Sequence, residues 1–254
     1  TATGMASAQM HEVVHVGEAG LVGEVVRLVD DSAVIQVYED TTMLKPGAVV
    51  KPTGMPLSVN LGPGLIGSIY DGIQRPLPGI AAQSGAWLRR GEKVEPLDME
   101  RTWHFAPLVK VGDTVHGGAT LGEVAETALV RHLIMVPPNV TGTVQSIAAA
   151  GDYTLRDTIC TIATTGGQQT LTMLQRWPVR TPRPISKRLR ISEPLVTGQR
   201  IVDMLFPIGK GGAAAIPGGF GTGKTITQHQ LAKWSDADVI VYIGCGERGN
   251  EMTD

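Results

Sequence analysis

The residues Gly218–Thr225 have the types and spacing that bind a phosphate group. They match the pattern G-x-x-x-x-G-K-[ST] at every position. Glycines let the main chain wrap around an anion, so its N–H groups can converge on the phosphate. We expect Lys224 to contact the β- and γ-phosphates and the Thr225 hydroxyl to ligate Mg²⁺. The predicted site for ATP or ADP with Mg²⁺ consists of Gly218, Gly219, Phe220, Gly221, Thr222, Gly223, Lys224 and Thr225.

A charged cluster, Glu247, Arg248 and Glu251, follows the apolar run Asp238–Ile243. Ligands of parallel sheets lie outside the carboxyl ends of the strands, so we expect Glu247 to reach the phosphate site. A carboxylate there orients or deprotonates the attacking water. Arg248 is a candidate to hold Glu247 or the substrate, and Glu251 to hold a Mg²⁺-bound water. The alternative is that these residues form a solvated charged turn. The presence of the phosphate loop nearby disfavours this alternative.

The elements expected around these residues form a strand–loop–helix–strand unit. Ala213–Ile216 predicts a short strand and Gly223–Trp234 predicts a helix. Asp238–Ile243 is a continuous apolar run, which is typical of a buried strand in a parallel sheet. Gly198–Phe206 predicts a short amphipathic helix, with Ile201, Val202 and Leu205 on one side.

The sequence before this unit is rich in short predicted strands. His11–Val16, Leu21–Leu28 and Ala33–Tyr38 favour a small barrel, with a hairpin turn at Val29–Ser32. Residues 65–83 predict a connector with a short helix that Pro76 and Pro78 end.

Residues 107–164 predict a second β unit with an internal repeat of Gly-Asp followed by a strand. This unit resembles the flattened barrel of biotinyl and lipoyl carrier domains. Its candidate hairpin tip, Met135–Pro138, lacks the lysine that those carriers modify, which disfavours a carrier function. The basic, proline-rich residues 177–197 predict a linker.

The composition excludes several classes of protein. The chain has 254 residues, with 22 Lys and Arg against 24 Asp and Glu, so bulk positive charge is not available to bind nucleic acid. No run of 18 apolar residues encodes a membrane-spanning helix. The two cysteines, Cys160 and Cys245, form neither a disulfide framework nor a metal site, and we expect Cys245 to be a packed thiol.

Several segments together resemble the catalytic A subunit of vacuolar-type and archaeal-type (V/A-type) rotary ATPases. The resemblance covers essentially the whole chain. It is carried by Gly20–Val25, Ile69–Leu77, Gly198–Ile208, Gly218–Thr225, Leu231–Asp238 and Tyr242–Asp254. Chains of this family are about twice as long, so we interpret the sequence as a fragment that lacks the extreme N-terminus and the C-terminal half.

The resemblance implies a mixed fold with four parts. Residues 1–64 would form an N-terminal β-barrel without its first strand, which in the family precedes Gly4–Met5, and residues 65–100 a connector. Residues 101–176 would form a flattened β-sandwich or barrel, similar to the bulge domain that distinguishes A subunits from F-type β subunits. Residues 177–254 would begin a RecA-like α/β P-loop nucleotide-binding domain.

The resemblance also implies ATP hydrolysis or synthesis coupled to proton or sodium translocation. Lys224, Thr225, Glu247 and Arg248 would take the roles given above, and a neighbouring B subunit would add an arginine. The partners would be B subunits in an alternating A3B3 hexamer and the subunits of the central and peripheral stalks, with no nucleic acid. The complex would lie at the cytoplasmic face of a membrane, which only its ion-translocating sector contacts.

Two residues depart from the family pattern. Gly219 replaces a common Pro or Ala, and Thr222 replaces Ser or Cys, which excludes disulfide regulation at that position. The second half of the nucleotide domain is missing, so we expect the 254-residue chain alone to hydrolyse ATP poorly or not at all.

Two alternatives belong to other classes. One is another RecA-like hexamer, either an RNA translocase or a secretion ATPase. An RNA translocase should have exposed aromatic side chains on its barrel, whereas residues 11–63 contain only Tyr38. A secretion ATPase should lack the insertion of residues 101–176. The other is a non-catalytic B-type partner, which should lack Lys224 and Thr225.

Overall fold

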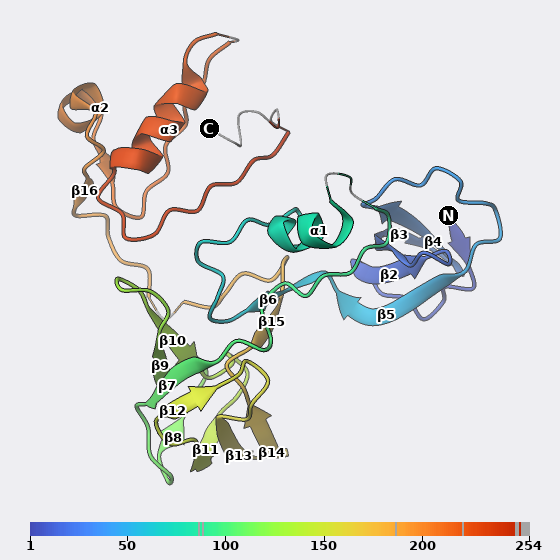
Figure 1. Ribbon diagram of the computed structural model, residues 1–254, viewed down its shortest axis with the longest axis horizontal. Coiled ribbons are helices and arrows are strands. Elements are labelled where there is room, and N and C mark those ends of the chain that lie inside the picture. Colours follow the sequence, from blue (N-terminus) through green and yellow to red (C-terminus); the bar gives the residue numbers. More distant parts are fainter. Residues whose placement is uncertain (86, 88, 186, 220, 247–248, 250–254) are drawn as a thin grey trace. The chain divides into compact units, whose positions relative to one another are not determined.

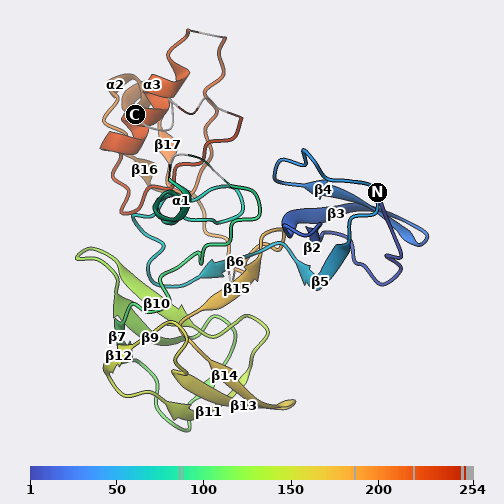
Figure 2. The ribbon, with the colours of Figure 1, turned by 45° about the vertical axis from the view of Figure 1, so that its right-hand side comes forward.

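The structure is a computed structural model that describes residues 1–85, 87, 89–185, 187–219, 221–246 and 249. These residues belong to two compact units, Thr1–Pro184 and Ile185–Asp254, which we describe separately. Figures 1 and 2 show the elements of each unit in two views. The first unit consists mainly of strands, and the described part of the second contains two helices and two very short strands.

The first unit begins with a five-stranded antiparallel sheet in the order β1-β4-β3-β2-β5, of which Figure 1 labels β2 to β5. The three strands predicted within residues 11–38 are confirmed, as is the β3–β4 hairpin, whose last pair is Val29 with Ser32. A further strand, β1, pairs with β4 at the place where the resemblance led us to expect none. The strands are β1 (Ala2–Thr3), β2 (Glu12–Val16), β3 (Leu21–Val29), β4 (Ser32–Val37) and β5 (Val50–Pro56).

The connector contains one helix, α1 (Leu77–Ser84), and the two nearby prolines stand at its start. Pro76 is the N-cap residue, and Pro78 lies in the first turn. The prediction that these prolines end a helix was therefore wrong. The first turn of a helix has N–H groups without an intrahelical acceptor, so proline loses nothing there, and its fixed φ favours the helix.

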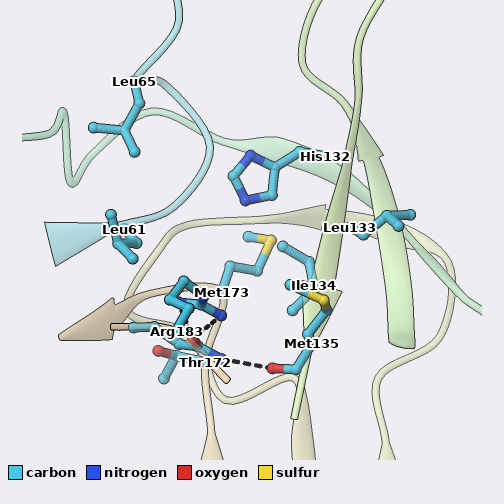
Figure 3. Close-up of a pocket in the computed structure, with 10 residues that line it drawn as sticks. Leu61, Leu65, His132, Leu133, Ile134, Met135, Thr172, Met173 and Arg183 are labelled. Carbon is cyan, nitrogen blue, oxygen red and sulfur yellow. Dashed lines mark hydrogen bonds between the residues drawn. The ribbon is translucent and has the colours of Figure 1, made fainter. Parts of the chain in front are cut away.

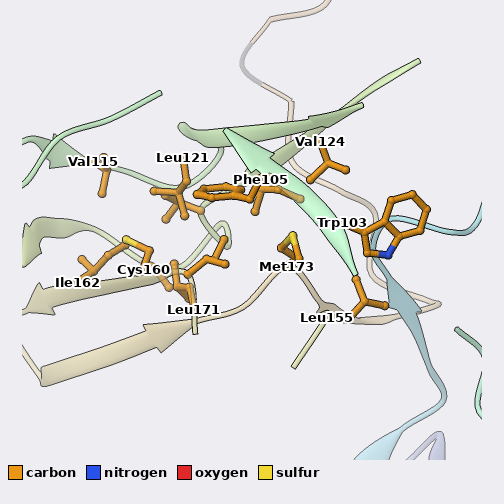
Figure 4. Packing of buried hydrophobic residues seen from close by; sticks show 14 of the residues in the cluster. Trp103, Phe105, Val115, Leu121, Val124, Leu155, Cys160, Ile162, Leu171 and Met173 are labelled. Carbon is orange, nitrogen blue, oxygen red and sulfur yellow. The ribbon is translucent and has the colours of Figure 1, made fainter. Parts of the chain in front are cut away.

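The second half of the first unit is a β-sandwich, as predicted. Two four-stranded sheets, β10-β9-β7-β12 and β14-β13-β11-β8, pack face to face. Figure 4 shows the core between them, in which Phe105, Leu121 and Leu155 are fully buried. Val136 is also buried, so Met135–Pro138 is no exposed tip. The strands are β7 (Trp103–Pro107), β8 (Thr114–Val115), β9 (Thr120–Ala125), β10 (Arg131–Met135), β11 (Gly142–Ile147), β12 (Gly151–Tyr153), β13 (Cys160–Thr164) and β14 (Gly167–Leu171).

The sandwich is inserted between two strands that pair with each other. β6 (Ser58–Leu61) leads toward the sandwich, and β15 (Gln175–Pro178) leads away from it. They pair antiparallel, with Leu61 opposite Gln175 and Ser58 opposite Pro178. The connector with α1 and the sandwich both lie between these strands in the sequence, so the chain returns to the place it left, which is typical of an insertion.

A buried carboxylate ties the first sheet to the segment after β15. Only 2% of the Glu24 side chain is exposed, and Arg180 donates to both of its oxygens, from Nε at 2.8 Å and from the second guanidinium nitrogen at 2.9 Å. Nδ1 of His11 lies 2.9 Å from the same carboxylate, and the Tyr38 hydroxyl donates to it. The hydrogen bonds from Arg180, then those from Tyr38 and His11, outweigh burial and lower the pKa of Glu24 to about 2. We call these four residues the Glu24 cluster.

The second unit contains both predicted helices but neither predicted strand of the parallel sheet. Residues 213–216 and 238–243 are not strands, and Val241 and Ile243 are each 78% exposed. Two strands joined through one helix make at most a two-stranded parallel sheet, in which the helix covers one face and the other face and both outer edges stay uncovered. The elements are β16 (Pro194–Leu195), α2 (Arg200–Leu205), β17 (Ile208–Gly209) and α3 (Lys224–Trp234).

The remaining apolar surface of this unit is also exposed. Ile201 and Leu205, on the predicted apolar side of α2, are 68% and 67% exposed. Among the described residues of the unit, Thr197 alone is buried. Its hydroxyl donates to Asp203 at 2.7 Å, and its N–H donates to the same oxygen at 3.0 Å.

The helices in the described part of the chain are α1, α2 and α3. No helix there has both the length and the apolar character needed to cross a bilayer.

Candidate nucleotide-binding site

The predicted phosphate loop leads directly into α3. The helix begins at Lys224, with Gly223 as its N-cap residue in the left-handed conformation at φ 81°. Gly221 is also left-handed, at φ 78°. A Cβ atom at either position would meet nothing within 4 Å, so backbone conformation rather than crowding requires glycine there. The predicted start of the helix is confirmed.

Lys224 lies across the loop that precedes it. Its ammonium group donates to the carbonyl of Gly218, with Nζ and O 2.6 Å apart, and so connects the start of the helix with the start of the loop. The Thr222 hydroxyl donates to the carbonyl of Gly219 at 2.9 Å. These contacts put a positive charge beside the main chain of the loop, as an anion site requires.

The N-terminus of α3 suits an anionic ligand. The first N–H groups of a helix have no intrahelical acceptor, and they carry its partial positive charge. Gly223 provides no capping side chain, and no acidic residue lies in the first turn of α3. No carboxylate from this turn therefore competes with a phosphate group for the helix end.

The donor set also fits Mg²⁺ in part. Thr225 lies in the first turn of α3, next to the lysine, and its hydroxyl is a hard oxygen ligand. Of the other predicted residues, Phe220, Glu247, Arg248 and Glu251 lie outside the described residues. Residues 238–243, which were expected to present Glu247, are not a strand, so the positions of Glu247, Arg248 and Glu251 beside the loop stay predictions.

Two contacts near the site were not predicted. The Tyr242 hydroxyl lies 3.3 Å from Nε2 of His229 on α3, and the centroids of the two rings are 5.6 Å apart. Residue 242 is thereby held against the helix by its side chain and not by a strand ladder. No spacing in the sequence signals this pair.

Cys245 is exposed, so the prediction of a packed thiol was wrong.

A second set of contacts joins Asp236, the second residue after α3, to residues that precede the phosphate loop. Nζ of Lys210 lies 2.9 Å from the carboxylate of Asp236, which also accepts a hydrogen bond from the N–H of Val196. The hydrogen bond from Lys210 lowers the pKa of Asp236 and raises that of Lys210. The carboxylate thus connects the segment after α3 to the residue that follows β16 and to Lys210.

Three family profiles match consecutive parts of the chain. Residues 2–54 match the "ATP synthase alpha/beta family, beta-barrel domain". Residues 94–180 match the "ATPsynthase alpha/beta subunit barrel-sandwich domain". Residues 198–254 match the "ATP synthase alpha/beta family, nucleotide-binding domain". The predicted mixed fold of barrel, sandwich and beginning nucleotide-binding domain is therefore confirmed.

Curated relatives match over essentially the whole chain. The A subunit of the A-type ATP synthase of Methanopyrus kandleri is 56% identical over 254 residues, which are 100% of this chain and 43% of that protein. The corresponding protein of Thermococcus sibiricus is 56% identical over 98% of this chain and 43% of its own length. The V-type ATP synthase alpha chain of Clostridium novyi is 55% identical over 100% of this chain, again 43% of its own length.

The chain thus spans less than half the length of these relatives. The three profiles follow one another in the order of its barrel, sandwich and phosphate loop. The chain therefore belongs to the ATP synthase alpha/beta family, in the group formed by the A subunits of A-type enzymes and the alpha chains of V-type enzymes.

Proposed function

We propose that this chain is part of the catalytic subunit of a rotary V/A-type ATPase, which hydrolyses or synthesises ATP and moves protons or sodium ions. The loop of residues 218–225 at the start of α3 carries the proposal, because it combines left-handed glycines, an ammonium group and an open helix N-terminus. The relatives are named as subunits of ATP synthases, which agrees with this chemistry.

In this proposal the residues of the loop bind and orient the nucleotide. The main-chain N–H groups of the loop hold the phosphate oxygens, and Lys224 neutralises the charge of the β- and γ-phosphates. Thr225 ligates Mg²⁺, which polarises the phosphoryl group when it is bound. Glu247 orients the attacking water, Arg248 holds Glu247 or the substrate, and Glu251 holds a Mg²⁺-bound water.

The wider assembly is part of the same proposal. Active sites would lie between alternating A and B subunits of a hexamer, which the central and peripheral stalks join to an ion-translocating sector. The complex would lie at the cytoplasmic face of the membrane. We also keep the assignment of residues 1–64, 65–100, 101–176 and 177–254 to barrel, connector, sandwich and nucleotide-binding domain.

The alternative ATPases receive less support. An RNA translocase needs exposed aromatic side chains on its barrel for stacking with bases. Tyr38 is the single aromatic residue in residues 11–63; it is 38% exposed and its hydroxyl is bound to Glu24, so the barrel offers no set of aromatic rings for stacking. A secretion ATPase should lack the sandwich, which here matches a family domain over residues 94–180.

ATP turnover by the assembled enzyme tests the proposal. The variant Lys224→Ala should lose nearly all turnover, because it lacks the charge next to the γ-phosphate. Lys233→Ala is the matched control, since this lysine lies in the last turn of the same helix. The control should retain turnover close to that of the unchanged enzyme.

Binding of a fluorescent ATP analogue separates affinity from chemistry. Lys224→Ala should weaken binding, whereas Glu247→Gln should preserve binding and lose turnover. An enzyme that keeps its turnover with Lys224→Ala would refute the proposal. Loss of nucleotide binding in Glu247→Gln would refute the role given to Glu247.

A further inference from the structure

The first unit contains a cavity of about 250 Å³ that the proposed function does not use. It lies between β10, the segment 172–175 and the chain after β6. Figure 3 shows the side chains that line it. Its apolar wall includes Leu61, Leu65, Met135 and Met173, and its polar groups include His132 and Arg183.

His132 is held in place by a buried carboxylate. Nδ1 of His132 lies 2.8 Å from Glu126, whose side chain is only 2% exposed. The other oxygen of Glu126 accepts hydrogen bonds from the N–H groups of Gly64 at 2.7 Å and Ile66 at 3.2 Å. A carboxylate hydrogen-bonded to one ring nitrogen fixes the orientation of an imidazole. The ring that faces the cavity is therefore preorganised.

Arg183 is positioned without an acidic partner among the described residues. Its guanidinium stacks on the ring of Trp177, 4.5 Å from the ring centroid, and lies 3.4 Å from the amide oxygen of Gln175. These hydrogen bonds are long compared with the usual 2.9–3.0 Å. Gln175 is itself fixed, since its amide nitrogen donates to the carbonyl of Met135 at 2.7 Å. The contact with Trp177 positions the guanidinium, and a carboxylate that binds its terminal nitrogens with two shorter hydrogen bonds would replace the two long ones to Gln175.

We propose that this cavity binds a small organic carboxylate with a short apolar body. Arg183 binds the carboxylate group, His132 contributes a second polar contact, and the apolar body lies against Leu61, Met135 and Met173. A few polar groups that converge at the edge of an apolar cavity are the usual pattern of a small-molecule site. The cavity belongs to the first unit and the phosphate loop to the second, and the proposal does not depend on the proposed catalytic function.

A pair of probe molecules tests the proposal on the 254-residue chain. Hexanoate and its neutral counterpart hexanamide have the same apolar body and differ in charge. The ε-methyl NMR signals of Met135 and Met173 report occupancy, because both side chains line the cavity. Hexanoate should shift these signals saturably and bind about tenfold or more tightly than hexanamide, as expected for hydrogen bonds to a charged group.

Two substitutions locate the binding group. Arg183→Gln should weaken hexanoate binding by about tenfold or more, since it removes the charged donors. Arg131→Gln is the matched control and should leave binding unchanged. Arg131 lies on β10 with 75% of its side chain exposed and pairs with Glu123 outside the cavity.

Several results would overturn the proposal. These are the absence of a saturable shift, equal binding of hexanoate and hexanamide, and unchanged binding in Arg183→Gln. Equal shifts with inorganic phosphate would show a general anion site and contradict the role of the apolar wall. The comparison of the two probes needs no variant, so it decides the matter even where a substitution disturbs folding.

Discussion

Replacing Glu24 with glutamine tests how the first sheet is held to the segment after β15. The pKa of Glu24 is lowered from 4.5 to about 2, which corresponds to about 3 kcal/mol of stability at neutral pH. Because the pKa in the folded state is the lower one, this contribution is complete above about pH 4.5 and is lost as the pH falls toward 2. Glutamine resembles the protonated carboxyl group, so Glu24→Gln should lack the contribution at every pH.

Amide hydrogen exchange in β3 and β4 is the appropriate assay. The chain has two units, so a single global unfolding transition would not report on the first sheet alone. Glu24→Gln should lower the opening free energy of these strands by about 3 kcal/mol at neutral pH. The difference from the unchanged protein should shrink between about pH 4.5 and 2.

Glu123→Gln is a matched control for this substitution. Glu123 pairs with Arg131 at 3.3 Å, but 27% of the glutamate side chain and 75% of the arginine side chain are exposed. A surface pair of this kind contributes about 0–1 kcal/mol. Equal effects of the two substitutions, or a difference that does not change down to about pH 2, would refute the reasoning from the Glu24 cluster.

Three further measurements test other parts of the structure. Burial and the neighbouring Glu24 raise the pKa of Tyr38 to about 12. The alkaline absorbance titration of Tyr38→Phe should therefore lack one late-titrating phenol. The first sheet of the unchanged protein should lose stability as the pH rises from 10 toward 12. Cys160 is buried and desolvation raises its pKa to about 11, whereas Cys245 is exposed. Iodoacetamide should therefore label Cys245 first. Rapid labelling of Cys160 in the folded chain would contradict the packing of the sandwich. Gly142→Ala places a Cβ atom against the carbonyl of Ala163 on β13. It should destabilise the sandwich by about 1–3 kcal/mol, which hydrogen exchange measures. Gly151→Ala is the control, because its Cβ atom meets only ordinary contacts and should change stability little.

The first unit could be predicted well because its strands are specified by local patterns. Val14 alternates with less buried neighbours along β2 and is fully buried in the structure. The Val29–Ser32 turn gives the hairpin its register. The Glu24 cluster could not be predicted, because Arg180 lies 156 residues from Glu24, and a single sequence carries no signal for such a pair.

The start of α3 and the glycine-rich turn before it could be predicted because their geometry is local. The left-handed glycines, the lysine and the helix start follow one another directly, and each needs only its neighbours. For the charged cluster after residue 246, the sequence shows which residue types are present but does not determine where they lie. Its position depends on a parallel strand, and a strand depends on hydrogen-bond partners elsewhere in the chain.

The contrast between the two units shows what converts an apolar segment into a strand. Ile159 and Ile162 lie in and beside β13, which pairs with both β11 and β14, and both side chains are almost completely buried. Ile240 and Ile243 lie in a run of comparable apolar character, yet they are 50% and 78% exposed, and their segment pairs with no strand among the described residues. Hydrophobic sequence alone therefore does not produce the sheet; a covered face and a paired edge are also needed. An element that supplies both should order residues 238–243 and reduce hydrogen exchange there, while leaving the locally determined loop and α3 unchanged.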